Sequence, residues 1–371
     1  MSKPIKIIIA GGKTGGHLFP GIATAQALKE QSNSVEILFV GTNTPFEKKT
    51  LLRYGFTHVA ISSSGIKGKG IREKLSAMAT IPFSVFQAAW IIVSFKPDLV
   101  LGVGGYSSGP VLMAARILGK RTAIQEQNAI PGITNRILSR IVHKIFISFK
   151  NTKGFPAGAN IILTGNPIRR ATPSPEADLS HEMPLPSFPG NGFNLLITGG
   201  SQGAASINKA VVEAMQRLSD TSSYTVIHQT GKNDQKQVVN AYKEMDINAT
   251  ARAFFHDMPQ RQKQADLIIC RAGAGTLSEI TSLGKPAILV PYPHAADDHQ
   301  RHNAMALVQQ GAAMMILDHE LNGNRLGKRI EQLRKNPEKL KRMAQQAKKI
   351  GMPHARNTVA REIIHLITKN R

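Results

Sequence analysis

Short apolar runs alternate with stretches of helical spacing along the whole chain. Such runs, bounded by glycine and polar residues, are typical of buried strands. In the first half they predict strands at Ile5–Ala10, Glu36–Val40, Leu99–Val103, Arg121–Gln125 and Lys144–Ile147. In the second half they predict strands at Asn194–Thr198, Thr225–Gln229, Ala251–Phe254, Leu267–Cys270, Ala287–Val290 and Met314–Ile316. Continuous apolar strands with helices between them predict an α/β fold with parallel sheets covered on both faces.

A proline-rich stretch without apolar periodicity, residues 172–192, separates the two sets of strands and has linker composition. Each half opens with a strand, a double glycine, a polar loop and a helix: IKIIIAGGKTGGHLFPGIATAQAL and FNLLITGGSQGAASINKAVVEAM. We expect two Rossmann-like domains facing each other across a cleft, with ligands outside the carboxyl ends of the strands. The expected boundaries are 1–168 and 169–350, and a C-terminal helix in 351–371 is expected to pack back on the N-terminal domain.

The charge balance adds a class of partner to this picture. The 371 residues include 47 Lys and Arg against 24 Asp and Glu, a net charge of +23. Such a chain attracts phosphate groups, nucleic acid or an anionic membrane surface. The single cysteine, Cys270, excludes a disulfide scaffold and a cysteine-based zinc site, and it fits a reducing cytoplasmic compartment. The first apolar run stops at glycines after five residues, too short for a signal-peptide core.

The segment Leu75–Phe95 contains 21 residues without a charge. Its length just reaches that of a membrane span, but Pro82, Gln87 and the strand that follows argue against one. Two interpretations remain: a packed amphipathic helix, or a helix whose outer face touches the bilayer. A preceding group of basic residues favours the second, because anionic lipid attracts such clusters. That group consists of Lys67, Lys69, Arg72 and Lys74.

Glycine-rich loops follow two strands of the first half. Gly11–His17 contains Gly-Lys-Thr, but Ile7 occupies the position where a P-loop requires glycine. The loop instead suits an anion at a helix N-terminus, and His17 there is either a polar cap or an acid/base or substrate-contact residue. Gly102–Gly109 allows either the approach of a diphosphate or tight packing. Glu126, just past the next strand, is either a helix cap or an acid in the cleft.

The second half carries three comparable segments. Gly199–Gly203 places N–H groups and the Ser201 hydroxyl at a helix start. Arg271–Glu279 is a strand end, a glycine turn and a helix, in which Glu279 either accepts hydrogen bonds from ribose hydroxyls or stabilises the helix dipole. Pro291–Asn303 holds three histidines and two aspartates whose spacing matches no zinc template. We expect a polar ligand-binding loop there and no metal.

Nine motifs in this order resemble the MurG family of peripheral membrane glycosyltransferases. They are GGKTGGHLFPG, SSSGIKGKGI, LGVGGYSSGP, QEQNAIPGITN, LTGNPIRR, ITGGSQGA, HQTGK, RAGAGTLSE and HQRHNA, and together they span essentially the whole chain. The first loop of the family usually reads GGTGGH, and Lys13 is inserted here. The resemblance implies a GT-B fold and inverting transfer of N-acetylglucosamine from UDP-GlcNAc to the 4-hydroxyl of lipid-linked N-acetylmuramyl-pentapeptide. It implies no cofactor and no metal.

The resemblance also implies the site. His17 and Glu126 are the candidates for acid/base work or acceptor binding, and the uracil is held mainly by backbone near Phe255. The implied substrate-binding residues, most of them in the second half, are Thr14, Gly15, Gly16, Asn128, Arg169, Ser201, Phe255, Ala274, Gly275, Thr276, Leu277, Ser278, Glu279 and Gln300.

The partners that the resemblance implies are UDP-GlcNAc, the lipid-linked acceptor, the anionic cytoplasmic face of the bacterial inner membrane, and other cell-wall synthesis and division proteins. Cell shape and the cell cycle would then depend on the chain. Two alternatives remain open: a UDP-N-acetylglucosamine 2-epimerase of the same architecture, and a basic nucleic-acid-binding protein. Only 5% of the residues are aromatic and no nucleic-acid-binding signature is present, so we expect no nucleic acid.

Overall fold

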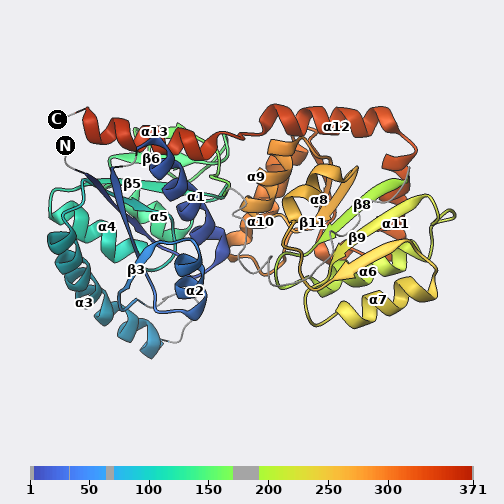
Figure 1. Ribbon diagram of the computed structural model, residues 1–371, viewed down its shortest axis with the longest axis horizontal. Helices are drawn as coiled ribbons and strands as arrows, with labels where there is room; N and C mark the ends of the chain where they lie inside the picture. The colour runs from blue at the N-terminus through green and yellow to red at the C-terminus, as the bar shows by residue number, and fades with distance from the viewer. Residues whose placement is uncertain (1–3, 33, 64–70, 170–191, 370–371) are drawn as a thin grey trace. The chain divides into compact units, whose positions relative to one another are not determined.

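The computed structural model describes residues 4–32, 34–63, 71–169 and 192–369, with only the backbone described for residues 71–79. The chain divides into two compact units (Figure 1). The N-terminal unit comprises residues 1–170 together with 354–371, and the C-terminal unit comprises residues 171–353. Apart from Gly192, the expected linker lies outside the described residues.

The N-terminal unit is built on a seven-stranded parallel sheet with the order β3-β2-β1-β4-β5-β6-β7. Its strands are β1 (Ile5–Ala10), β2 (Val35–Gly41), β3 (Thr57–Ala60), β4 (Leu99–Gly102), β5 (Arg121–Glu126), β6 (Lys144–Ile147) and β7 (Ile161–Leu163). The five predicted strands are confirmed. The two edge strands β3 and β7 were missed because β3 (THVA) lacks a continuous apolar run and β7 (IIL) is only three residues long.

The C-terminal unit is built on a six-stranded parallel sheet with the order β10-β9-β8-β11-β12-β13. Its strands are β8 (Phe193–Thr198), β9 (Tyr224–Gln229), β10 (Ala249–Arg252), β11 (Leu267–Cys270), β12 (Ala287–Leu289) and β13 (Ala313–Met315). All six predicted strands exist. The edge strand β10 begins two residues before its prediction, because the apolar pair Phe254–Phe255 lies beyond the strand.

Helices cover both faces of each sheet (Figure 1). Those of the N-terminal unit are α1 (Gly15–Gln31), α2 (Pro45–Arg53), α3 (Ile71–Phe95), α4 (Ser108–Ile117), α5 (Ile133–Leu138) and α13 (Ala355–Thr368). Those of the C-terminal unit are α6 (Ala205–Met215), α7 (Gln235–Glu244), α8 (Met258–Gln264), α9 (Ala274–Leu283), α10 (His299–Val308), α11 (Gly323–Arg334) and α12 (Pro337–Ile350), with the 3₁₀ turns η1 (Ala296–Asp298) and η2 (Asp318–Glu320).

The core of the N-terminal unit has one layer on each face of the sheet. Ile7 and Ile9 belong to one apolar cluster and Ile8 to the other, as expected when successive side chains of a strand point to opposite faces. All three are fully buried, which explains why the strands show continuous apolar runs. The positions of the glycine loops at the strand ends are therefore fixed by a packed sheet.

Helix α13 returns from the end of the chain to pack on α1. Its residues Val359 and Ile363 are fully buried in the same cluster as Ile7 and Ile9. The Arg356 guanidinium donates to Glu30 of α1 at 2.9 and 3.2 Å. The last helix is thus an integral part of the N-terminal unit.

Helix α3 contains the uncharged segment of the sequence and is continuous through Pro82. From residue 80 onward, its inner face includes Ala88 and Ile92, which are fully buried. No helix among the described residues is long and apolar enough to cross a membrane. Lys67 and Lys69 of the basic lead-in lie outside the described residues, as do the side chains of Arg72 and Lys74.

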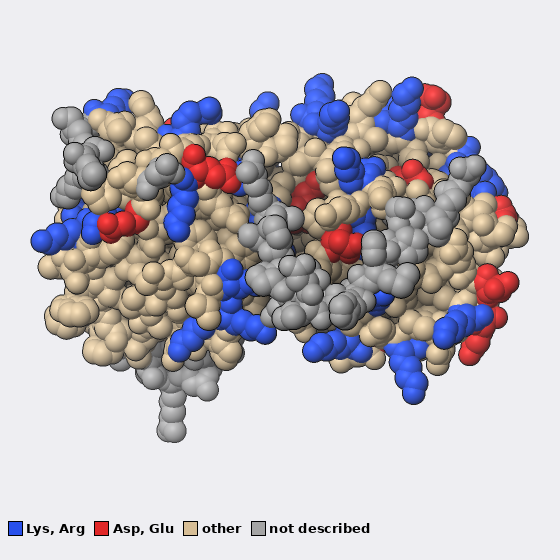
Figure 2. Space-filling view, viewed as in Figure 1, with Lys and Arg blue, Asp and Glu red and all other residues tan. Residues whose placement is uncertain are grey.

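The outer face of α3 is apolar. Phe83, Phe86, Trp90 and Val93 are 56, 71, 70 and 57% exposed. Figure 2 shows a broad area without charged side chains over α3 and the neighbouring α4, whereas Lys and Arg are spread over the rest of this face. Single exposed apolar residues are ordinary, but a contiguous apolar area of this kind is typical of a binding surface.

Candidate functional site

Two glycine loops touch at the carboxyl end of the N-terminal sheet. Gly11 has φ +126°, and a Cβ there would lie 2.1 Å from the carbonyl oxygen of Gly104 in the second loop. Gly104 has φ +94°, and a Cβ there would lie 2.6 Å from Nδ1 of His17. Only glycine allows the two loops and the imidazole to approach this closely. The structure therefore brings the two predicted loops and His17 together.

Lys13 occupies a left-handed position in the first loop, with φ +69°. Its N–H donates to Oε1 of the fully buried Glu47 at 2.7 Å, and Oε2 of Glu47 accepts from the N–H of Thr42 at 3.0 Å and from the Thr44 hydroxyl at 3.0 Å. The conformation that Lys13 adopts is costly for a residue with a Cβ, so Glu47 stabilises the loop. Sequence reasoning missed Glu47, although Thr44-x-x-Glu47 has the form of a capping box.

His17 lies in the first turn of α1, and its Nδ1 is 3.1 Å from Oε1 of Gln127. The Gln127 amide nitrogen donates to the carbonyls of Val103 at 3.0 Å and Gln125 at 3.2 Å, which turns the amide oxygen towards His17. Desolvation by burial lowers the pKa of His17, and the bonds to Gln127 and the Val103 carbonyl oppose this shift. The imidazole is therefore neutral near pH 7.

Glu126 ends β5 and is 1% exposed. Its Oε1 accepts from the Asn128 N–H at 2.9 Å, and its Oε2 accepts from the Gly132 N–H at 3.2 Å and the Asn135 amide at 2.8 Å. Burial raises the pKa of this carboxyl, and these hydrogen bonds lower it. Both oxygens are occupied by the turn that leads into α5, which is the cap interpretation of Glu126.

The remaining first-half candidates lie at different places. Thr14 is the exposed residue before α1, and Gly15 and Gly16 form its first turn. The Asn128 amide donates to Glu126 at 3.3 Å. Arg169 donates to the Tyr54 hydroxyl at 2.9 Å and stacks over the Phe19 ring at 4.0 Å, so its guanidinium is held on the N-terminal unit.

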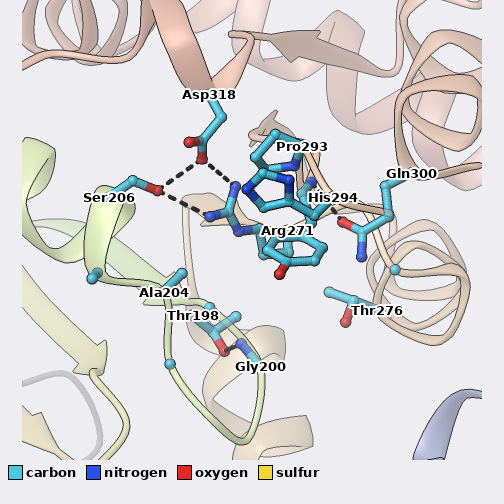
Figure 3. A pocket seen from close by; sticks show the side chains of 15 residues that line it. Thr198, Gly200, Ala204, Ser206, Arg271, Thr276, Pro293, His294, Gln300 and Asp318 are labelled. Carbon is cyan, nitrogen blue, oxygen red and sulfur yellow. Dashed lines mark hydrogen bonds and ion pairs between the residues drawn. The ribbon is translucent and has the colours of Figure 1, made fainter. Parts of the chain in front are cut away.

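The C-terminal unit has a pocket at the carboxyl ends of β8 and β11 (Figure 3). Its wall includes Gly200 of the GGSQG loop, Thr276 of α9 and Gln300 of α10. Of the substrate-binding residues that the resemblance implies, Thr276 and Gln300 line this pocket. The Gln300 amide oxygen accepts the Tyr292 N–H at 3.0 Å, which joins α10 to the histidine-containing loop.

Arg271 is the centre of the hydrogen-bond network in this pocket (Figure 3). Its guanidinium donates to Asp318 Oδ1 at 2.5 Å, to the Ser206 hydroxyl at 2.9 Å and to the Pro291 carbonyl at 3.1 Å. The Ser206 hydroxyl donates to the same Asp318 oxygen at 2.7 Å. Arg271 thus ties the strand end of β11 to α6 and to the loop after β12. Sequence reasoning placed Arg271 in a motif but missed its partners.

The GGSQG loop packs on the end of β9. A Cβ on Gly203, which has φ +77°, would lie 2.0 Å from the Thr230 carbonyl oxygen. Ser201 at the tip of the loop is exposed and is not among the pocket-lining residues. The glycines therefore serve close backbone contact, and the Ser201 hydroxyl faces solvent.

The six candidates from Ala274 to Glu279 form the first two turns of α9. Ala274 and Leu277 are buried, Gly275 and Thr276 are partly exposed, and the Ser278 hydroxyl donates to the Ala274 carbonyl at 2.8 Å. Glu279 Oε2 accepts from the Gln262 amide of α8 at 3.0 Å. The α9 N-terminus places its N–H groups beside the pocket, where they suit an anion.

Phe255 lies just beyond β10 and is 3% exposed, with the Arg261 guanidinium 4.1 Å above its ring. Its side chain is therefore part of the core, and only its backbone can contribute to recognition. Within the described ranges, no group of three or more His, Cys, Asp or Glu side chains could hold a metal ion.

Two parallel-sheet Rossmann-like units with glycine loops at their strand ends define the class: a GT-B glycosyltransferase fold. The chain belongs to glycosyltransferase family 28. Residues 7–147 match its N-terminal domain and residues 194–359 its C-terminal domain. Within that family it belongs with MurG: a solved structure of MurG from Acinetobacter baumannii shares 31% identity and a TM-score of 0.80, covering 99% of this chain and all of that one.

Curated relatives agree along the whole chain. The chain is 42% identical to a protein of Myxococcus xanthus, over 98% of this chain and 94% of the relative, and 41% identical to one of Syntrophus aciditrophicus, over 98% and 99%. Both are named UDP-N-acetylglucosamine–N-acetylmuramyl-(pentapeptide) pyrophosphoryl-undecaprenol N-acetylglucosamine transferase. A UDP-GlcNAc 2-epimerase from Neisseria meningitidis shares the fold, with a TM-score of 0.68 and 15% identity.

Proposed function

We propose that this chain transfers N-acetylglucosamine from UDP-GlcNAc to the 4-hydroxyl of lipid-linked N-acetylmuramyl-pentapeptide. The observation that carries the proposal is identity of about 41% over nearly the full length to transferases named for this reaction. The epimerase alternative is not favoured, because its solved representative is related in fold alone.

The C-terminal unit is the proposed donor site. The α9 N-terminus and the GGSQG loop offer N–H groups to the diphosphate of UDP-GlcNAc. Glu279 accepts from the ribose hydroxyls, and the backbone at Phe255 contacts the uracil. Departing UDP carries the charge that develops in the transition state, so these same N–H groups stabilise the leaving group.

His17 is the proposed general base of the N-terminal unit. Its Nδ1 carries the proton, because the atom of Gln127 that faces it is the amide oxygen, which can only accept. The amide nitrogen of Gln127 donates to the Val103 carbonyl instead. Nε2 then holds the lone pair. Nε2 takes the proton of the muramyl 4-hydroxyl as the hydroxyl oxygen bonds to C1 of N-acetylglucosamine. At the same time the bond from C1 to the UDP oxygen breaks, and its electron pair goes to UDP. Attack from the opposite face converts the α-linked donor into a β-1,4 product.

Glu126 is the proposed positioning residue of this half. Its carboxylate holds the Asn128 N–H and the Gly132 N–H, so it fixes the turn that presents Asn128 to substrate. With four donors on two oxygens it is poorly placed to remove a proton.

The exposed face of α3 and the net charge of +23 support a peripheral position at the cytoplasmic face of the bacterial inner membrane. Apolar insertion and charge attraction act together in such binding, because one weak signal gives only marginal attachment. A role in cell-wall synthesis links the chain to cell shape and division, and proteins of those processes are its further proposed partners.

The deciding experiment supplies the purified chain with UDP-GlcNAc labelled in the sugar and a lipid-linked muramyl-pentapeptide analogue. We expect a labelled disaccharide product and free UDP. Incubation with UDP-GlcNAc alone separates the alternatives, since formation of UDP-N-acetylmannosamine without an acceptor would indicate an epimerase. Failure to transfer sugar to the acceptor would refute the proposal.

A further inference from the structure

Gln229, the last residue of β9, is a buried amide that belongs to the HQTGK motif but is not among the predicted site residues. It is 3% exposed. Its Nε2 donates to the Gly200 carbonyl at 2.9 Å and to the Thr198 hydroxyl oxygen at 3.3 Å. Its Oε1 accepts the N–H of Phe255 at 3.0 Å. Because a backbone N–H can only donate and a carbonyl can only accept, these partners fix the orientation of the amide.

The partners of Gln229 lie in two different segments. Thr198, the last residue of β8, and Gly200 of the GGSQG loop line the pocket on the proposed phosphate side. Phe255 belongs to the segment after β10, the proposed base side. The next two residues bond to the chain just before Phe255 through the backbone: the N–H of Thr230 donates to the carbonyl of Arg252, the last residue of β10, at 2.9 Å, and the N–H of Gly231 donates to the Ala253 carbonyl at 3.1 Å.

The bond to Phe255 fixes more than one N–H. No cis peptide occurs among the described residues, so the peptide between Phe254 and Phe255 is trans. In a planar trans peptide the C=O points opposite to the N–H. With the Phe255 N–H held by Gln229, the Phe254 carbonyl points away from the Gln229 amide. A carbonyl oxygen is a hydrogen-bond acceptor, the group that a pyrimidine with a ring N–H requires.

We propose that Gln229 is a positioning residue that couples the phosphate loop to the base-recognition segment, so that one amide sets both the affinity for the donor diphosphate and the preference for uracil. The inference rests on the proposed function of the C-terminal unit. Gln229 itself does not touch the donor. It acts through the Gly200 carbonyl on one side and the Phe255 N–H on the other.

Two substitutions separate the two sides of the amide. Gln229→Leu removes both the donor and the acceptor of the amide. It leaves the Gly200 carbonyl and the Phe255 N–H without this partner. Gln229→Glu, measured at pH 9 to favour the carboxylate, keeps an acceptor for the Phe255 N–H, and its ionised form opposes the Gly200 carbonyl with negative charge. The probes are UDP and CDP, whose dissociation constants are measured by calorimetry, together with donor KM and kcat.

For Gln229→Leu we expect the Kd for UDP to rise about tenfold and the preference for UDP over CDP to fall, the size expected for a lost buried hydrogen bond. For Gln229→Glu at pH 9 we expect the Kd values for UDP and CDP both to rise, while the preference for UDP over CDP persists. In both variants the donor KM should rise by a similar factor and kcat at saturating donor should change less than about threefold, since neither side of the amide touches the reacting atoms.

Asn248→Ala provides the matched control, because the Asn248 amide donates to Thr225 at 3.4 Å at the opposite end of the same sheet. It should leave both nucleotide affinities unchanged. Folding is checked by circular dichroism, and if Gln229→Leu does not fold, the isosteric Gln229→Glu decides. Unchanged UDP affinity and UDP-over-CDP preference in the folded variants would overturn the inference alone. Wild-type protein that binds no UDP-GlcNAc would overturn the proposed function.

Discussion

Nδ1 of His17 faces the amide oxygen of Gln127 at 3.1 Å, and this contact determines which imidazole nitrogen can act as a base. The Gln127 nitrogen is held by two carbonyls, so its amide cannot present a donor to His17 without losing both bonds. The proton is therefore on Nδ1 and the lone pair on Nε2. The arrangement is that of a base oriented by a neighbouring group.

His17→Gln should lower kcat roughly 10²–10⁴-fold, because proton removal from the acceptor hydroxyl loses its base. The Kd for UDP-GlcNAc should stay within about twofold, since the proposed donor site lies in the C-terminal unit. Single-turnover kinetics and calorimetry measure the two quantities separately. A folded variant with near-normal kcat would reduce His17 to a helix cap.

The pH profile tests the same imidazole independently. Burial lowers the pKa of His17 from the usual 6.5, so the active neutral form persists to lower pH than for an exposed histidine. We expect the acid limb of kcat/KM to have its midpoint below pH 6.5 and the activity to level off above that midpoint. A midpoint at or above pH 6.5 would show that His17 is not the group that titrates.

Glu279→Ala should weaken donor binding by roughly 1.5–3 kcal/mol, the value of a charge-assisted hydrogen bond to the ribose. That corresponds to a rise of about 10- to 150-fold in the Kd for UDP-GlcNAc. Glu331→Ala, on α11 of the same unit, is the charge-matched control and should bind normally. An unchanged KM for UDP-GlcNAc in folded Glu279→Ala would exclude the ribose contact.

The strands and the glycine loops were predictable because both are local signals. Continuous apolar runs such as Ile7–Ala10 fill two core layers, and a glycine pair at a strand end marks a close backbone approach. The residues that support the loops were not predictable. Glu47 lies 34 positions from Lys13, and Arg271 lies 47 positions from Asp318, so only the folded sheet brings these partners together.

His228 makes the C-terminal unit sensitive to acid. Its Nδ1 lies 2.9 Å from the Tyr242 hydroxyl and its Nε2 lies 2.9 Å from Asn208 Oδ1, and burial lowers the pKa of the imidazole to about 3. Above pH 6.5 both folded and unfolded chains hold a neutral imidazole, and the histidine has no pH effect. As the pH falls from 6.5 towards 3, only the unfolded chain binds the proton, so stability is lost by about 1.4 kcal/mol per pH unit.

Urea unfolding between pH 7 and pH 4, followed by circular dichroism, measures this loss. His228→Gln keeps a donor and an acceptor but cannot titrate, so its stability should fall less steeply over the same range. His302→Gln, an exposed histidine of the same unit, should retain the wild-type slope. Parallel slopes for wild type and His228→Gln would contradict the assignment.

The exposed face of α3 should carry the apolar part of membrane attachment. Phe86 and Trp90 are 71 and 70% exposed while Ala88 and Ile92 behind them are fully buried, so replacing the outer pair by serine removes apolar surface without opening the core. We expect Phe86→Ser with Trp90→Ser to reduce binding to vesicles containing anionic lipid at least about tenfold, as a two-signal attachment loses one signal. The matched control is Leu52→Ser on α2, where the replaced leucine is 80% exposed, and this variant should bind vesicles as wild type does.

Salt should weaken the binding of the wild-type protein to these vesicles too, since attraction between exposed charges is screened within about 10 Å at 0.1 M. Activity on a water-soluble acceptor should survive in the double variant, because its substitutions lie outside both glycine loops. Vesicle binding that is unchanged in the double variant would place the docking surface elsewhere on the chain.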